Sequence, residues 1–149
     1  YDIVDGSDVN MTVIAKGFGS ENVSCAYMMK PTSTVEEVSQ QIIQTIINAG
    51  PNACPPFVIG VGIGGTLEKA SILAKKATAK TTYHHDQRYA DLEKKLETKI
   101  NQLQIGPLGF KGDLTVLGLR ILDFPTHIAG LPVVVNVCCH QSRHKEITL

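Results

Sequence analysis

Apolar residues recur at helical spacing in three stretches of the chain. The first stretch places four of them on one helix face: Val35, Val38, Ile42 and Ile46. Ser33 and Glu36 fit a capping box at its start, with Ser33 as the N-cap, and Gly50, followed by a proline, ends it. The same spacing predicts two further helices, over residues 67–80 and 89–103.

Four apolar runs rich in β-branched residues predict strands. They are residues 9–15, 57–61, 114–122 and 131–138. Glycine-bearing loops are expected at 16–22 and 105–112, and a polar linker at 83–88. Strands alternate with helices at first and dominate the end of the chain, which predicts an α/β (mixed α+β) fold with a mixed sheet covered by about three helices. The length of 149 residues indicates a single domain over 1–149.

Composition excludes several classes of protein. Lys and Arg balance Asp and Glu at a formal net charge of zero, and only 5% of residues are aromatic, so no nucleic-acid partner is expected. No run reaches the roughly 18 apolar residues of a membrane helix. The chain starts without Met in a polar, acidic segment and enters a strand soon afterwards, so we expect a piece of a larger, cytoplasmic polypeptide. Its four cysteines have no regular spacing and are expected to be reduced thiols or cluster ligands.

A glycine-rich turn is expected between the strand at 57–61 and the next helix. Gly60, Gly62 and Gly65 satisfy the pattern G-x-G-x-x-G. A dinucleotide site would next need a second strand ending in an acidic residue, and no strand precedes Asp86, so a nicotinamide cofactor is disfavoured. Two interpretations stay open: close packing of the helix on the strand, and an anion site at the free N–H groups of the helix start.

The cysteines and histidines form no regular metal motif. There is no C-x-x-C, and Cys138-Cys139-His140 with His144 is an irregular ligand set for zinc. Cys54, beside two prolines, and Cys139 each lie at the end of an apolar segment. For each of them, a buried thiol packed among apolar side chains is the ordinary interpretation, and a ligand of a metal cluster is the more specific alternative. His127 in a strand-entry loop is ordinarily a structural hydrogen-bonding residue. Lys16, after a strand, is either an exposed lysine or an anchor for a carboxylate.

Several segments together carry a resemblance to a known family. They are Lys16-Gly-Phe-Gly-Ser-Glu-Asn22, Ala53-Cys-Pro-Pro-Phe57, Gly60-Val-Gly-Ile-Gly-Gly-Thr66, Ile105-Gly-Pro107, Thr126-His-Ile-Ala129, and Leu131-Pro-Val-Val-Val-Asn136 with His140. In this order they resemble the α region of the class I, iron–sulfur-dependent fumarases and the related L-tartrate dehydratases, over the whole chain.

The resemblance implies a hydro-lyase component that holds a [4Fe–4S] cluster on three cysteines. Cys54 matches the second ligand and Cys139 the third, with Cys138 as the alternative. His127 matches a histidine that contacts the substrate and takes a catalytic role, and Lys16 is a weaker candidate for substrate binding. The expected reaction is reversible hydration of fumarate to malate; the alternatives are dehydration of L-tartrate and a non-catalytic fragment without a cluster.

The chain also departs from the family pattern. The first cluster cysteine of the family lies upstream in a Cys-Gln-Asp-Thr-Gly segment, and neither this segment nor the β region occurs in the chain. We therefore expect the C-terminal part of an α region, with a small dicarboxylate substrate. The expected protein partners are the upstream α segment and a β subunit or domain, in a homo- or hetero-oligomer.

Overall fold

A computed structural model describes residues 2–80, 88–140 and 143–149. Its elements, in chain order, are β1 (Asn10–Ala15), η1 (Phe18–Val23), β2 (Cys25–Met29), α1 (Val35–Ala49), η2 (Gly50–Ala53), β3 (Phe57–Gly64), α2 (Leu67–Lys80), α3 (Ala90–Asn101), η3 (Pro107–Gly109), β4 (Val116–Phe124), β5 (Leu131–Cys138) and β6 (Arg143–Thr148). The mixed α+β class expected from the sequence is confirmed. The polar linker expected at 83–88 lies outside the described residues, apart from Arg88.

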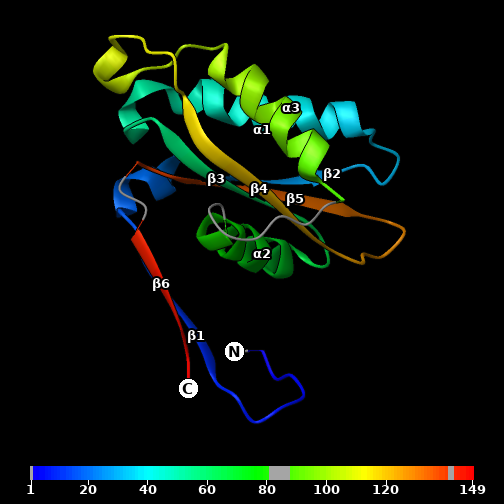
Figure 1. The fold of residues 1–149 in the computed structure, drawn as a ribbon. Coiled ribbons are helices and arrows are strands. Elements are labelled where there is room, and N and C mark those ends of the chain that lie inside the picture. The colour runs from blue at the N-terminus through cyan, green and yellow to red at the C-terminus, as the bar shows by residue number, and fades with distance from the viewer. Residues whose placement is uncertain (1, 81–87, 141–142) are drawn as a thin grey trace.

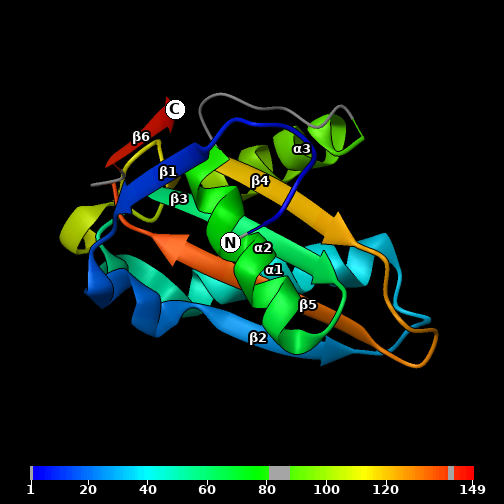
Figure 2. The ribbon, with the colours of Figure 1, turned by 90° about the horizontal axis from the view of Figure 1, so that it is seen from below.

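The body of the molecule is a three-layer arrangement around a mixed sheet. Four strands lie in the order β2-β5-β3-β4; β3 and β4 are parallel, and β5 runs antiparallel to both β2 and β3. Helices α1 and α3 cover one face of this sheet and α2 covers the other (Figure 1). Strands β1 and β6 form a separate two-stranded sheet that leaves the body (Figures 1 and 2).

The two faces of β3 are built differently because successive side chains of a strand point to opposite sides. Phe57, Ile59 and Val61 are fully buried in the main core, where they meet α1 and α3. On the other face, a Cβ at Gly60 or Gly62 would lie only 2.1 or 2.0 Å from a backbone oxygen of α2. The close-packing interpretation of these glycines is therefore confirmed. Gly60 lies in the strand as expected, whereas the expected place of Gly62 in a turn is wrong, because β3 continues to Gly64.

The first helix begins one residue later than expected. Thr34, not Ser33, is the N-cap: its side chain accepts the N–H of Glu37 at 3.2 Å, and Glu37 Oε2 accepts the N–H of Thr34 at 2.8 Å. The sequence Ser33-Thr-Val-Glu-Glu37 contains two overlapping capping-box frames, and spacing alone does not choose between them. The helix ends as expected at Gly50, which has a φ of 55°.

Two strands were not expected from the sequence. Cys25–Met29 forms β2 by pairing with β5, and Arg143–Thr148 forms β6 by pairing with β1. Neither is rich in β-branched residues, and β6 is mainly polar. Their conformation comes from long-range pairing, which local propensity does not register.

Helix α3 occupies the free side of β4, which is an outer strand of the sheet. Glu93 Oε1 accepts the N–H of Ile121, Glu97 Oε1 accepts that of Leu119, and Asn101 Oδ1 accepts those of Thr115 and Val116, all at 2.8–2.9 Å. Glu93 is buried and its other oxygen pairs with Arg120 at 3.3 Å. Side chains four residues apart on the helix thus accept hydrogen bonds from amides of β4 and the residue before it.

Candidate functional site

The predicted thiol residues Cys54 and Cys139 lie at the same end of the sheet. Strand β3 begins there and the antiparallel β5 ends there, with Val58 opposite Cys138. The backbone N–H of His140 donates to the carbonyl of Cys54 at 3.4 Å, and His140 Nδ1 lies 3.3 Å from the same oxygen. The two segments that carry the thiols are therefore in direct contact.

The end of β1 joins the same place. A Cβ at Gly17 would lie 3.5 Å from Cys139 Sγ, so the backbone of Gly17 passes close to this sulfur. Lys16 precedes it; its amine forms an ion pair with Glu21 and donates to Ser20 Oγ at 3.3 Å. We call this region, comprising Lys16, Gly17, Cys54, Cys139 and His140, the thiol end.

The thiols at this end differ in exposure. Cys54 is exposed and has a left-handed backbone with φ 59°, Cys139 is half-buried, and Cys138 is buried. Burial raises the pKa of the Cys138 thiol, which favours its protonated, unreactive form. Of the two neighbours, Cys139 is thus the better candidate for a thiolate ligand.

Glu21 connects the thiol end to the body of the molecule. Its carboxylate pairs with Lys16 and Lys75 and accepts the side-chain N–H of Asn136 at 3.0 Å. Burial alone would raise the pKa of Glu21, but the hydrogen bonds from the two lysines hold it below its ordinary value. Sequence reasoning did not single out Glu21, although it lies in the Lys16–Asn22 segment that carried the family resemblance.

His127 lies at the opposite end of the sheet from the thiols. Its loop joins the end of β4 to the start of β5, whereas Cys139 follows the end of β5. Eight strand residues at about 3.3 Å each separate the two by roughly 25 Å. Here His127 Nδ1 accepts the N–H of Ala129 at 3.1 Å. Within one chain, the structure does not bring His127 together with Cys54, Cys139 or Lys16.

The turn after β3 lies near His127. Gly64 and Gly65 have φ values of 84° and 67° and lead into α2. The start of α2 borders a wide depression of about 430 Å³, whose lining includes Thr66, Lys69 and His127. The anion interpretation of this helix start stays a prediction.

The described residues contain no complete metal centre. Among them, no three His, Cys, Asp or Glu side chains are grouped so that they could hold a metal ion. The irregular zinc set does not assemble: Cys138 is buried at the end of β5, whereas His144 lies in β6 opposite Ile14. The described helices also include none with both the length and the apolar character needed to cross a membrane.

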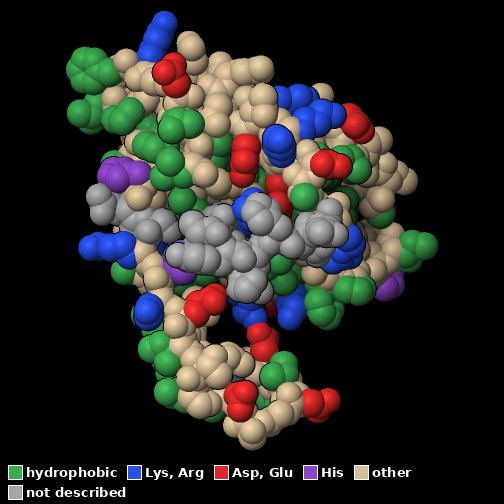
Figure 3. Space-filling model, in the orientation of Figure 1, with side chains coloured by type: hydrophobic (Ala, Val, Ile, Leu, Met, Phe, Trp, Pro, Cys, Tyr) green, Lys and Arg blue, Asp and Glu red, His purple; other side chains and the backbone are tan. Residues whose placement is uncertain are grey.

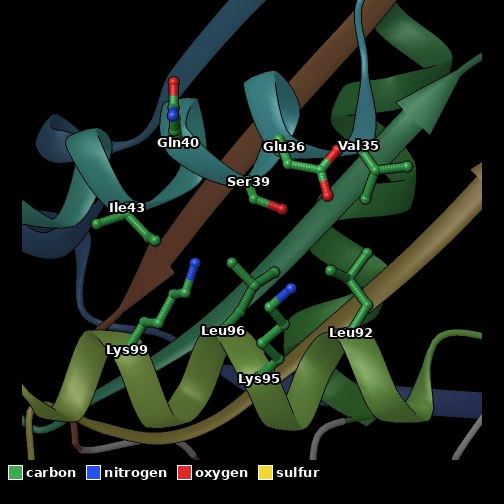
Figure 4. Close-up of a pocket in the computed structure, with 9 residues that line it drawn as sticks. All are labelled: Val35, Glu36, Ser39, Gln40, Ile43, Leu92, Lys95, Leu96 and Lys99. Atoms are coloured by element: carbon green, nitrogen blue, oxygen red, sulfur yellow. The ribbon is translucent and has the colours of Figure 1, made fainter.

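A small groove also lies between α1 and α3. Glu36 and Ser39 of α1 face Lys95 and Lys99 of α3 across it (Figure 4). Its volume of about 90 Å³ is well below the roughly 300–1,000 Å³ of pockets that hold small molecules. It therefore does not compete with the thiol end as a candidate site.

Comparison with known proteins identifies relatives of this chain. The family model described as fumarate hydratase (Fumerase) matches residues 1–148. The chain is 42% identical over 138 residues to the "Putative L(+)-tartrate dehydratase subunit alpha" of Methanocaldococcus jannaschii, covering 91% of this chain and 48% of that protein. It is 32% identical over 146 residues to the L(+)-tartrate dehydratase subunit alpha of Escherichia coli K12, covering 96% of this chain and 48% of that protein.

The chain thus spans about half the length of the relatives it matches. Both relatives are named as alpha subunits of L(+)-tartrate dehydratase, one of them as putative, and the matches cover nearly all of the chain. The chain therefore belongs to the fumarate hydratase (Fumerase) family.

Proposed function

We propose that this chain is part of the α component of a hydro-lyase that acts on a small dicarboxylate, with its thiol end forming part of the catalytic centre. The observation that carries the proposal is the contact between the Cys54 and His140 segments, which brings Cys139 beside Cys54 from 85 residues away in the sequence. Buried packing would not require an exposed cysteine in a left-handed backbone at this contact.

The residues of the thiol end fit part of a [4Fe–4S] site. Cys54 and Cys139 would supply two thiolate ligands from adjoining segments, and Gly17 places no side chain against the sulfur of Cys139. We assign the third ligand to the upstream α segment, since the described residues group no third donor with these two. When bound, such a cluster offers an iron without a protein ligand, a Lewis acid for a substrate hydroxyl.

Lys16 is the proposed cation for a substrate carboxylate at this end. Its amine is now held by Glu21 and Ser20, and the side chain is only 11% exposed. Binding a substrate carboxylate would require the amine to share or exchange these partners. Replacement of Lys16 by Met should then raise KM more than it lowers kcat, because the lost contact is one of binding.

The cluster assignment is tested by anaerobic reconstitution with iron and sulfide, in the presence of the upstream α segment and the β subunit. We expect Cys54→Ser and Cys139→Ser to lose bound iron and visible absorbance. Cys25→Ser is the matched control, because Cys25 belongs to β2 and lies outside the thiol end. Full iron content in Cys54→Ser would refute the assignment, and loss of iron in Cys138→Ala but not Cys139→Ser would move the ligand to Cys138.

The position of His127 constrains its proposed role. Because it lies roughly 25 Å from the thiol end of its own chain, His127 can contact a substrate held there only from a second copy. We therefore propose a shared site between two copies of the α component. A mixture of His127→Ala and Cys54→Ser chains, each inactive alone, should then recover about a quarter of full activity, because half of randomly formed dimers contain one intact site of two.

No recovery in that mixture, with mixed dimers verified by mass spectrometry, would refute the shared site. Activity retained in His127→Ala alone would remove His127 from the mechanism. In either case the cluster assignment remains separately testable by iron content.

Fumarate and L-tartrate are equally supported as substrates, because the family model is named for the first and the curated relatives for the second. The assay is direct: the reconstituted enzyme is given each substrate, and loss of fumarate absorbance or formation of oxaloacetate is measured. The alternative, a non-catalytic fragment, predicts neither product nor bound iron once the upstream segment is restored.

A further inference from the structure

Strands β1 and β6 form an arm that leaves the body of the molecule (Figures 1 and 2). They pair antiparallel from Ala15 opposite Arg143 to Asn10 opposite Thr148, and Val9 and Leu149 exchange two further backbone hydrogen bonds at 2.9–3.0 Å. We call residues 9–15 and 143–149 the arm. Leu149 ends the chain on the arm, whereas residues 2–8 lead from Val9 back to α2, where Asp2 forms an ion pair with Lys76 (Figure 2). The base of the arm adjoins the thiol end, because Lys16 directly follows Ala15.

The inner face of the arm is mainly polar. Asn10, Thr12, Ile14 and Glu146 line a cavity of about 540 Å³ together with Lys75 and Lys76 of α2, and Met11 borders it. The alternation of side chains along a strand fixes the composition of this face. The arm therefore turns its polar face toward the body.

The outer face of the arm is mainly apolar, with Lys145 opposite Val13 and Arg143 opposite Ala15 at its base. Residues opposite each other in an antiparallel pair share a face, so Val9 lies with Leu149 and Met11 with Ile147, and Val13 follows. These five side chains are 44–72% exposed. Figure 3 shows hydrophobic side chains along this outer side of the arm.

This arrangement is the reverse of an ordinary surface sheet, which packs its apolar face on the core and turns its polar face to water. An isolated two-stranded ribbon is marginally stable in water, and a contiguous exposed apolar patch typically marks an interaction site. The outer face of the arm thus has the character of a surface that is covered in the assembled protein.

We propose that the outer face of the arm is covered by the portion of the α subunit that this chain does not span. The relatives are about twice as long as the matched region, which ends on the arm at Leu149 and begins at α2, a few residues before Val9 of the arm. Polypeptide that follows Leu149 is tethered directly beside the apolar face, and polypeptide that precedes residue 1 is tethered to it by the short segment before Val9. A short tether gives a high effective concentration.

The proposal has a consequence for the thiol end. A segment bound along the arm would extend to the base of the arm, where Gly17 passes close to the sulfur of Cys139. The arm would thereby guide the missing α portion to the region that lacks a third metal donor among the described residues. The docking itself rests on family membership and not on the reaction, so its test needs no activity.

Photo-crosslinking tests the proposal. Residues 1–149 are produced together with the remaining α portion and the β subunit, with benzoylphenylalanine in place of Met11 or, in a separate protein, in place of Thr12. Position 12 faces α2 and should crosslink to Lys75–Ala79 in its own chain, which verifies that the arm is folded as described. Position 11 should crosslink to a peptide of the α portion outside residues 1–149.

Each other result overturns the proposal. A crosslink from position 11 to a second copy of residues 1–149, or to the β subunit, identifies a different occupant. No protein crosslink from position 11 shows an uncovered face, and loss of the position-12 crosslink shows that the arm does not turn its polar face to the body.

An affinity measurement with matched variants gives a second test. With the α portion supplied as a separate chain, Val13→Ser on the outer face should weaken its binding about tenfold. Thr12→Ser on the inner face of the same strand should change the binding less than twofold. Equal effects of the two variants would refute a docking site confined to the outer face.

Discussion

Replacement of Gly62 by Ala should destabilise the protein strongly, because α2 leaves no space for a methyl group. A Cβ at this position would lie 2.0 Å from the backbone oxygen of Ala70 and 2.7 Å from the backbone nitrogen of Ala74. Ordinary contact begins at 3.4 Å, so the helix must move by about 1.4 Å to accept the new carbon. No flexible side chain can yield instead, since both neighbouring atoms belong to the backbone.

The expected cost follows from this displacement. Overpacking a core by a single carbon typically costs about 1–3 kcal/mol, and the upper end applies here because α2 also packs on β4 and β5. We therefore expect a loss of about 3 kcal/mol in the free energy of unfolding. For a chain of this length, that corresponds to a fall in Tm of roughly 6–12 °C.

Urea denaturation followed by circular dichroism measures this loss. Gly19→Ala is the matched control: no atom lies within 4 Å of a Cβ at Gly19, so its effect should stay within about 0.5 kcal/mol. A loss below about 1 kcal/mol in Gly62→Ala would refute the close packing of α2 on β3. In that event the glycines would need another explanation, such as backbone contact with a ligand.

Three further predictions concern buried charge, pH and thiols. Glu93→Leu removes the buried carboxylate that pairs with the Arg120 guanidinium and accepts the N–H of Ile121, and should cost about 3 kcal/mol in urea unfolding, whereas exposed Glu68→Leu should cost little; equal effects would contradict the buried pairing. Because the pKa of Glu21 is held below its ordinary 4.5 in the folded state, its contribution to stability is complete above pH 4.5 and is lost as the pH falls through the lower, folded value. The Glu21→Gln variant should therefore show a weaker acid dependence of Tm, and an unchanged one would refute the ion pairing. Iodoacetamide should modify the exposed Cys54 first and the buried Cys138 last, and mass spectrometry showing the reverse order would contradict the assigned exposures.

Much of the body of the fold could be predicted from the sequence. The apolar stripe of α1 and the uninterrupted apolar runs of β3 and β5 are periodic signals that depend only on local spacing, and each predicted element is present. The N-cap was misplaced by one residue because two capping frames overlap. Strands β2 and β6 were missed because only their pairing partners, far away in the sequence, hold them extended.

The layout of the candidate site residues could not be predicted from the sequence. The family resemblance singled out Cys54, Cys139, Lys16 and His127, and the structure places three of these at one end of the sheet. It places His127 at the other end, because the whole length of β5 lies between His127 and Cys139. The direction of a strand depends on the whole sheet, which the local sequence does not reveal. The sequence also could not predict that the apolar face of the arm points away from the body, since it does not reveal which side of a two-stranded ribbon faces the body.

The row of side chains from α3 along β4 also constrains how the sequence can change. Four helical residues rise about 6 Å, close to the length of two strand residues, so the acceptors at 93 and 97 keep step with the amides of Ile121 and Leu119, while Asn101 reaches the amides of Thr115 and Val116 at the start of β4. Inserting or deleting one residue within this stretch would rotate the later acceptors away from the strand by about 100°. The newly bare strand would then be open to pairing with foreign chains. Length variation between homologues should accordingly spare the span 93–101 and accumulate in the loops on either side of it.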